Sequence, residues 1–347
     1  MITDRSNATR RRFLGTLGSA ALAPSFAPSA PDEKAVNLLA FGDWGASPDM
    51  DDPKDNPRVK LLQERVAAAM TDYATKLQLA GVRLDAVLAL GDNFYGPLKS
   101  EDDKRFADRF ENLYPKPALD SPFYFALGNH DYEDDKHVKD PAKKNWKHEL
   151  AYARAHPDGR WRFPAVGDAT WYRLDFPSGQ QPLLSIILLD TNTDHVKERW
   201  EGQIAWMKQE LADCQKSRWR MVAAHHPMFT DGYHFDGKKD PHLYPKIRET
   251  ILPELGSATF YLSAHDHNQQ HIRHPGHKHL DFLLSGAGGG DFIQKRRRPE
   301  GDAPWTNRFM ESYGFLHLRF SEAEATAQFI GVTDKGWELL GQPVRRT

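Results

Sequence analysis

Short apolar runs alternate with amphipathic stretches along the chain from residue 35 onward. Five of these runs have the length of a strand, and each ends abruptly in small or polar residues. They are Val36–Phe41, Leu84–Leu90, Pro122–Leu127, Trp219–Ala224 and Thr259–Ala264. Runs that are apolar for most of their length are typical of strands buried on both faces, as in a sheet covered by helices.

Two of the intervening stretches predict helices. Val59–Ala80 is long and rich in alanine, and Gln203–Lys216 carries apolar residues at helical spacing. Strands that alternate with helices predict an α/β sheet. Ligands of such sheets bind beyond the carboxyl ends of the strands. The polar residues that follow the five runs are therefore expected to converge on one crevice.

The first thirty residues resemble an export signal. The run Arg10–Leu14 places three arginines before Phe and Leu, and a short, mildly apolar stretch follows up to Ala23. A charged start, a short apolar middle and a small-residue end characterise secretory signals, and an arginine pair at this place resembles a twin-arginine signal. The alternative is an amphipathic or disordered tail. We expect residues 1–30 to be removed after export by the twin-arginine machinery to the periplasm or beyond, leaving residues 35–347 as a single domain.

The composition narrows the class of protein. Of 347 residues, 39% are hydrophobic and 27% are charged, with a formal net charge of −2. This balance suits a globular protein and argues against binding to nucleic acid or to a membrane surface. No apolar run reaches the ~18 residues of a membrane-spanning helix, so no stable membrane insertion is expected. The basic cluster Lys295–Arg298 is interpreted as a solvated loop, with an anion-steering rim as the alternative.

The single cysteine, Cys214, excludes an intramolecular disulfide and a thiolate metal cluster. A small packed side chain is its expected role. Any metal site in this chain must therefore use nitrogen and oxygen donors, and the 16 histidines leave that possibility open.

Side chains able to bind metals follow all five apolar runs. They are Asp43 after the first, Asp92 and Tyr95 after the second, Asn129 after the third, His225 after the fourth, and His265 and His267 after the fifth. Each cluster alone has a plainer explanation, because an aspartate at a strand end commonly forms a turn. Together they supply only oxygen and imidazole donors, which favours iron, zinc or manganese over softer ions.

A pair of such ions suits displacement at phosphorus. Two metals held ~3.5–4 Å apart clamp the attacking and leaving oxygens, and a bound hydroxide supplies the nucleophile near neutral pH. Phosphoryl transfer requires this positioning more than covalent help from the protein. The spacing of His265 and His267 fits the scheme, because alternate residues of an extended segment share a side and can each reach a different ion.

These clusters, in this order, resemble the metallophosphoesterase superfamily, and within it the small, tartrate-resistant type of purple acid phosphatase. Most of the superfamily carries a histidine two residues after the first aspartate, where this chain has Gly45. Purple acid phosphatases instead have a tyrosine three residues after the second aspartate, and Tyr95 stands there. The similarity extends from about Val36 to near the C-terminus. It implies a four-layer α/β/β/α sandwich of two packed mixed sheets flanked by helices.

The resemblance also implies the role of each site residue. A ferric ion would be held by Asp43, Tyr95 and His267, a divalent ion by Asn129, His225 and His265, and Asp92 would bridge the two. The divalent ion of the family is iron, zinc or manganese. His130 and His234 match histidines that contact the phosphate or the leaving group, with a surface histidine as the alternative for His234.

The activity implied by the resemblance is that of an exported acid phosphatase that acts on small phosphate monoesters. A phosphodiesterase or nucleotide hydrolase on the same centre is the enzymatic alternative. A non-catalytic metal- or phosphate-binding protein is the alternative of another class.

Two further stretches lie near the expected site. The glycine-rich run Ser285–Gly290 lacks the Gly-Lys-Ser/Thr ending of a nucleotide P-loop, so we interpret it as a strand-end loop beside the site. The charged segment Asp131–Lys147 is expected to be a solvated excursion at the rim.

Overall fold

A computed structural model describes residues 34–45, 57–133, 144–235, 238, 242–299, 301–302 and 305–347. The predicted export signal lies outside the described residues, as does the middle of the charged segment 131–147. None of the helices in the described ranges combines the length and the apolar character needed to cross a membrane.

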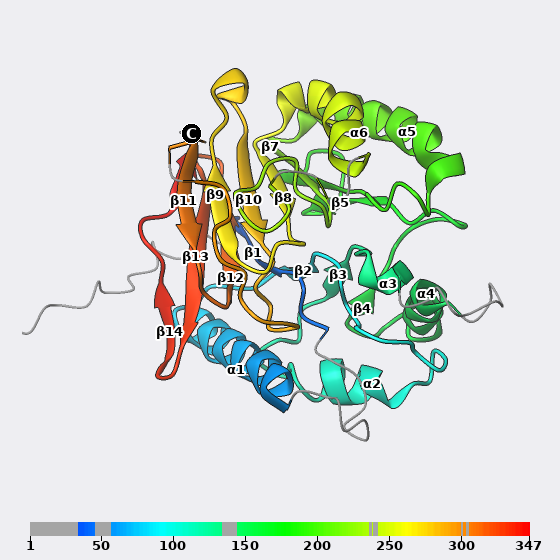
Figure 1. The fold of residues 1–347 in the computed structure, drawn as a ribbon, viewed down its shortest axis with the longest axis vertical. Helices are drawn as coiled ribbons and strands as arrows, with labels where there is room; N and C mark the ends of the chain where they lie inside the picture. Colours follow the sequence, from blue (N-terminus) through cyan, green and yellow to red (C-terminus); the bar gives the residue numbers. More distant parts are fainter. Residues whose placement is uncertain are drawn as a thin grey trace, which may run out of the picture.

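Two mixed sheets form the centre of the molecule (Figure 1). The first sheet has the strand order β14-β13-β12-β1-β2-β3-β4, and β15 also pairs with β13. Its strands are β1 (Val36–Phe41), β2 (Ala86–Ala89), β3 (Phe123–Phe125), β4 (Trp161–Arg162), β12 (Gly314–Phe320), β13 (Ala325–Thr333), β14 (Gly336–Leu339) and β15 (Val344–Arg346). The second sheet has the order β11-β9-β10-β8-β7-β6-β5. Its strands are β5 (Tyr172–Phe176), β6 (Leu184–Leu188), β7 (Trp219–Ala223), β8 (Phe260–Ser263), β9 (Gln269–Ile272), β10 (Asp281–Ser285) and β11 (Thr306–Met310).

Helices cover the outer face of each sheet. They are α1 (Pro57–Leu79), α2 (Lys104–Phe106), α3 (His130–Glu133), α4 (Asn145–Ala155), α5 (Trp200–Asp213) and α6 (Leu243–Thr250). Short turns of other helix types are η1 (Ala107–Glu111), η3 (Lys197–Arg199), η4 (Cys214–Lys216), η5 (Leu252–Ser257) and η6 (Pro275–His277). The helix α1 lies along the first sheet, and α5 and α6 lie against the second (Figure 1).

A hydrophobic core lies between each pair of adjacent layers, three in all among the described residues. Strand β1 shows how the sequence supplies residues to two of them. Its residues Leu38 and Ala40 point into the core between the two sheets. Its other face presents Leu39 and Phe41 to the core under α1. Because each face of the strand meets an apolar layer, the strand is apolar throughout instead of alternating with polar residues. A third core lies between the second sheet and α5 and α6, and it includes the buried Cys214. The predicted four-layer sandwich is confirmed.

Strand direction brings the five polar clusters to one edge. Strands β1 to β4 are parallel to one another, and so are β6, β7, β8 and β10. The carboxyl ends of β1 and β10 meet across the sandwich, because the backbone N–H of Gly42 donates to the carbonyl of Ser285 at 2.8 Å. Each predicted ligand cluster therefore lies at the same edge, where the two sheets face each other.

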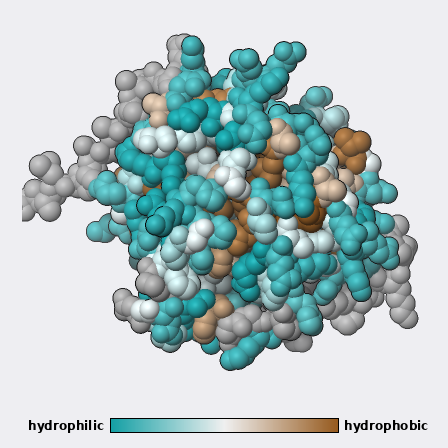
Figure 2. Space-filling model, turned by 90° about the horizontal axis from the view of Figure 1, so that it is seen from above, coloured by the Kyte–Doolittle hydropathy of each residue, from teal (hydrophilic) through white to brown (hydrophobic). Residues whose placement is uncertain are grey.

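The outer surface is largely polar. Figure 2 shows one face, which is mostly hydrophilic, with hydrophobic residues visible in small groups. Within the described ranges, the exposed large hydrophobic residues are Leu61, Leu79, Val166 and Phe292.

Candidate metal centre

Three of the predicted ligands sit in an uncommon backbone conformation. Asp43, Asp92 and His265 have φ angles of 53°, 51° and 73°. Non-glycine residues rarely adopt this left-handed region, and each instance costs ~1–3 kcal/mol. Such residues persist where the surroundings fix them, typically at functional sites. Here the turn ends the strand sharply, and the backbone N–H of His265 donates to Asp43 Oδ2 at 2.7 Å, joining the two sheets.

A first set of donor atoms surrounds one point. Tyr95 Oη lies 3.3 Å from Asp92 Oδ2 and 3.4 Å from His267 Nε2, and His267 Nε2 lies 3.5 Å from Asp43 Oδ1. Donors bound ~2.0–2.2 Å from one ion stand ~3 Å or slightly more from each other. The four side chains therefore fit around a single cation with small adjustments.

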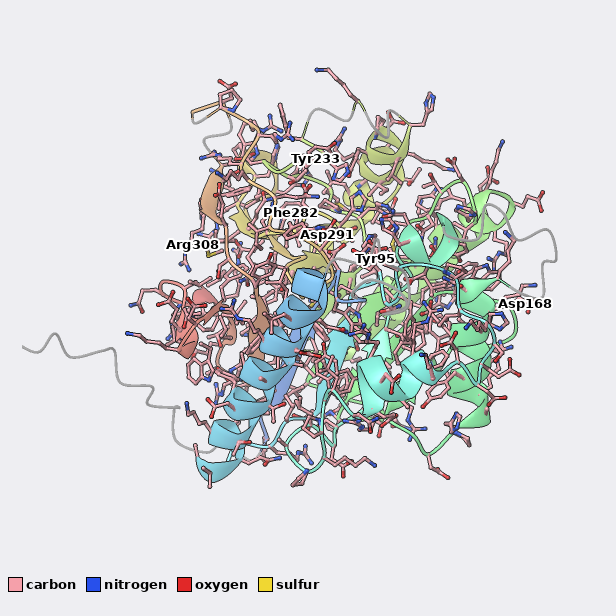
Figure 3. All side chains as sticks on the ribbon, turned by 60° about the horizontal axis from the view of Figure 1, so that its bottom comes forward. Tyr95, Asp168, Tyr233, Phe282, Asp291 and Arg308 are labelled. Atoms are coloured by element: carbon pink, nitrogen blue, oxygen red, sulfur yellow. The ribbon has the colours of Figure 1, made fainter. Side chains whose placement is uncertain are left out.

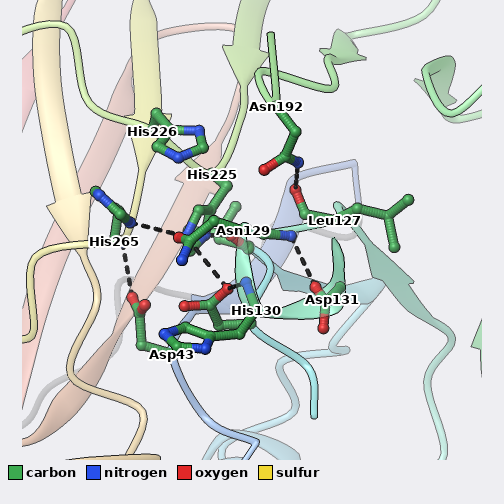
Figure 4. A network of polar contacts seen from close by, with 12 residues as sticks. Asp43, Leu127, Asn129, His130, Asp131, Asn192, His225, His226 and His265 are labelled. Carbon is green, nitrogen blue, oxygen red and sulfur yellow. Dashed lines mark hydrogen bonds and ion pairs between the residues drawn. The ribbon is translucent and has the colours of Figure 1, made fainter. Parts of the chain in front are cut away.

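A second set lies beside the first. His225 Nε2 is 3.2 Å from Asn129 Oδ1, 3.2 Å from His265 Nδ1 and 3.5 Å from Asp92 Oδ1. The two carboxylate oxygens of Asp92 thus face different donor sets, which is the placement a bridging carboxylate requires. Figure 4 shows part of this network.

Burial and charge also fit a bound cation. Asp43 Oδ1 is buried without a hydrogen-bond partner, and burial raises the pKa of Asp43. Burial and the charges of Asp92 and Asp43 raise the pKa of Tyr95 well above its ordinary value. Burial lowers the pKa of His265, which keeps that imidazole neutral, as a metal ligand must be. A cation in this place would stabilise the carboxylates and favour the phenolate of Tyr95.

The donor types divide between the two sheets. Every oxygen donor follows a strand of the first sheet, and every nitrogen donor follows a strand of the second. The oxygen donors are Asp43 after β1, Asp92 and Tyr95 after β2, and Asn129 after β3; the nitrogen donors are His225 after β7, and His265 and His267 after β8. Both donor sets therefore take ligands from both sheets.

Close packing explains why Tyr95 rather than a residue at position 45 completes the first set. A Cβ added at Gly45 would lie 2.3 Å from the carbonyl oxygen of Asn93, so no side chain fits there without a backbone shift. The glycine-rich run is a loop against the same donors, as its sequence predicted. A Cβ at Gly290 would lie 2.7 Å from Tyr95 Cε2, and one at Gly286 would lie 2.6 Å from Asp43 Oδ2.

His130 and His234 flank the two donor sets. The His130 backbone N–H donates to Asp92 Oδ1 at 2.9 Å, and its ring packs on Tyr95 with centroids 4.5 Å apart. His234 Nδ1 lies 2.8 Å from Asp266 Oδ1, and its ring stacks on His265 with centroids 4.2 Å apart. Both rings line a cavity of about 410 Å³ together with four of the predicted ligands, Asp92, Asn129, His265 and His267. His234 is therefore a residue of the cavity and not a surface histidine.

The cavity also contains residues that the sequence did not single out. Tyr233, Asp291 and Gln294 line it, and Figure 3 shows Tyr95 and Asp291 close together near the centre of the molecule, with Tyr233 beyond them. The buried ring of His226 packs on His265 with centroids 4.5 Å apart, and its Nδ1 lies 2.8 Å from Thr191 Oγ1. The position of His226 directly after a predicted ligand was the available signal.

Two expectations about charged segments are wrong for some of their residues. Asp131, assigned to a solvated excursion, is buried, because its carboxylate accepts hydrogen bonds from the backbone N–H groups of Asn93 at 2.9 Å and Gly128 at 2.7 Å. In the basic cluster, interpreted as a solvated loop, Lys295 and Arg297 are exposed, whereas Arg296 and Arg298 pair with the buried carboxylate of Asp231.

The chain belongs to the calcineurin-like phosphoesterase family, whose sequence model matches residues 36–269. The matched range begins at β1, ends at the start of β9 and contains all seven predicted ligands. Dinuclear metal centres are used in this family and by purple acid phosphatases.

Similar relatives within this family are purple acid phosphatases, as the sequence resemblance indicated. Purple acid phosphatase 17 of Arabidopsis thaliana is 28% identical over 325 residues, covering 88% of this chain and 84% of the relative. Tartrate-resistant acid phosphatase type 5 of Oryctolagus cuniculus is 27% identical over 326 residues, covering 86% of this chain and 88% of the relative.

Solved structures share the fold. Purple acid phosphatase PPD1 from yellow lupin seeds superposes with a TM-score of 0.64 at 16% identity, covering 90% of this chain and 53% of that one. GAP50, described as the anchor in the inner membrane complex of Plasmodium, gives 0.65 at 18% identity, covering 88% and 89%. At these identities the likeness establishes the fold alone.

Proposed function

We propose that the protein is an acid phosphatase that hydrolyses small phosphate monoesters at a dinuclear centre. One observation carries the proposal: two adjacent donor sets share the carboxylate of Asp92, and Tyr95 Oη belongs to one of them. When bound, two such ions activate a water nucleophile near neutral pH and neutralise phosphoryl charge.

The chain's own residues supply binding and proton transfer around that centre. Asp266 engages Nδ1 of His234, which leaves Nε2 as the ring nitrogen available to a ligand in the cavity. His130 lines the same cavity, next to Tyr95. Histidines so placed can contact a phosphate oxygen or donate a proton to the departing alkoxide. We assign this role to both.

The metals follow from the donor chemistry. The set with two carboxylates, the phenol of Tyr95 and one imidazole suits a hard trivalent ion, so we assign ferric iron to it. The set with two imidazoles and the amide of Asn129 suits a divalent ion, either iron, zinc or manganese.

Turnover with two chromogenic esters tests the proposal. Protein purified aerobically is analysed for metals and assayed with p-nitrophenyl phosphate and with bis(p-nitrophenyl) phosphate. We expect the monoester to be the faster substrate. A faster diester would identify a phosphodiesterase, and phosphate binding without turnover in metal-loaded protein would identify a non-catalytic member of the fold.

We further propose that the protein is exported in the folded state, which the arginines of the run Arg10–Leu14 support. Replacing the three arginines by lysine should retain active enzyme in the cytoplasm of a bacterial host. Undiminished activity outside the cytoplasm in that variant would exclude the twin-arginine route.

A further inference from the structure

The loop Thr230–His234 carries His234 over the metal centre, and little secondary structure supports it. It lies between β7 and α6. On its inner side, the hydroxyl of Thr230 and the ring of His234 both form hydrogen bonds with the carboxylate of Asp266. Asp266 stands between the predicted ligands His265 and His267 in the sequence. A Cβ at Gly232 would lie 2.6 Å from Asp266 Oδ2, so the loop is pressed closely onto this carboxylate.

On its outer side the loop is held through one buried acid. Asp231 is 1% exposed, and its backbone N–H donates to Gln270 Oε1 at 2.9 Å. Its carboxylate lies 2.7 Å from Arg296 Nη2 and 2.9 Å from Arg298 Nε. A buried carboxylate requires ion pairs or hydrogen bonds to offset the loss of its hydration. The two arginines therefore neutralise the buried charge of Asp231 and help to fix the position of the loop.

Backbone contacts fix the segment Gln294–Arg298, which carries the two arginines, at both of its ends. The N–H groups of Arg297 and Arg298 donate to the carbonyl of Asp231 at 2.9 and 3.1 Å. At the other end, the N–H of Gln294 donates to the carbonyl of His267 at 2.9 Å, and Gln294 Oε1 accepts from the His267 N–H at 3.2 Å. The segment Gln294–Arg298 thus connects the loop of His234 to a metal ligand.

Aromatic contacts reinforce the connection. The guanidinium of Arg297 lies 4.6 Å from the ring centroid of Tyr233, and that of Arg298 lies 5.3 Å from the ring of Phe235. Guanidinium groups at such distances are attracted to aromatic faces. Three residues of the basic run therefore contact the loop or the residue that follows it, which a run that serves only to attract anions would not require.

We propose that Arg296 and Arg298 are positioning residues for catalysis: through Asp231 they hold the loop so that His234 faces the reacting phosphate. The proposal rests on the catalytic role assigned above to His234. It distinguishes the four basic residues of the run, because Lys295 is exposed and makes none of the contacts to Asp231.

Steady-state kinetics of the metal-loaded enzyme test whether Arg296 and Arg298, but not Lys295, have this positioning role. The double variant Arg296→Met/Arg298→Met should lower kcat for p-nitrophenyl phosphate at least ~10-fold, because a positioned histidine is typically worth ~10²–10⁴ in rate. KM and metal content should stay close to those of wild type. Replacing Arg296 by lysine instead of methionine in the double variant should recover part of the lost kcat, since an ammonium group can still pair with Asp231. Lys295→Met, which removes one charge from the same run, is the matched control and should leave kcat unchanged.

A double-mutant cycle with His234→Ala shows whether the arginines act through His234. In the His234→Ala background, the double variant should cause no further loss of kcat. An equal loss in both backgrounds would overturn the proposal, and so would a rise in KM that Lys295→Met reproduces, because that result would identify an anion-steering rim.

A measurement that needs no turnover separates this proposal from the proposed function. Hydrogen exchange of the backbone amides at residues 230–235 should accelerate in the double variant and not in Lys295→Met. Wild-type protein without phosphatase activity would refute the proposed function while leaving this test intact. Unchanged exchange in the double variant would refute the positioning role.

Discussion

A single methyl group at Gly128 should strongly weaken metal binding without altering any predicted ligand. It lies between β3 and Asn129, and a Cβ added there would stand 2.1 Å from Asp92 Oδ1 and 2.4 Å from Asp92 N. Ordinary van der Waals contact begins at 3.4 Å. The bridging carboxylate and its backbone would therefore have to move by about 1 Å, whereas a metal site tolerates deviations of ~0.2 Å in ligand distance.

We expect Gly128→Ala to lower the affinity for both ions by at least ~100-fold, the upper end of what a displaced supporting residue costs. Metal content after dialysis, measured by inductively coupled plasma mass spectrometry, checks this. Phosphatase turnover should fall in proportion. The backbone conformation of Gly128 is not left-handed, so alanine itself is compatible with it.

Gly202→Ala is the matched control, because a Cβ at this exposed position of α5 meets nothing within 4 Å. It should keep both metals and stabilise the protein by ~0.5–1 kcal/mol, the cost of a glycine within a helix. Circular dichroism of metal-free Gly128→Ala reports whether that variant has folded. A folded variant with the metal content of wild type would refute the reasoning.

Three further predictions follow from the site and its surroundings. Tyr95→Phe should be colourless where iron-loaded wild type shows a visible absorption band, because the phenolate–iron(III) charge transfer is lost; a band that persists would disprove the tyrosinate ligand. His130→Ala should lower kcat by ~10²–10⁴ and retain both metals, whereas His225→Ala should lose one ion, as metal analysis beside kinetics would show. Although burial opposes ionisation, hydrogen bonds led by His271 lower the pKa of Asp281 to about 2 from 3.8, which corresponds to about 2 kcal/mol of stability at pH 7. Because the folded-state pKa is depressed, this stability is present above pH 3.8 and is lost as the pH falls towards 2, so urea denaturation should show Asp281→Asn less stable by that amount at pH 7 and equal to wild type near pH 2.

Much of the fold was predictable because its signals are local. The run Val36–Phe41 coincides with β1, and the predicted helix Val59–Ala80 differs from α1 by at most two residues at either end. Strands buried on both faces are apolar throughout, and this pattern is visible within a few residues. The convergence of the ligand clusters followed from a rule about the carboxyl ends of parallel strands, which the strand directions satisfy.

What remained hidden depends on contacts between distant parts of the chain. Asp231 and Arg296 are separated by 65 positions, and a basic run has the same composition whether water or a buried carboxylate surrounds it. His226 gave a similarly ambiguous signal, since a histidine beside a ligand can point towards the site or away from it. Only the packing of its ring on His265 distinguishes the two.

The division of donors between the sheets has a consequence for the order in which the protein can mature. A folding intermediate that has formed only the first sheet offers oxygen donors alone, and one that has formed only the second offers imidazoles alone. Neither can assemble a complete site, because Asp43 and His267, or Asn129 and His225, come together only once the sandwich has closed. Metal binding is then expected late in folding, after the two sheets have packed together. Bound ions that take ligands from both sheets should slow the separation of the two sheets.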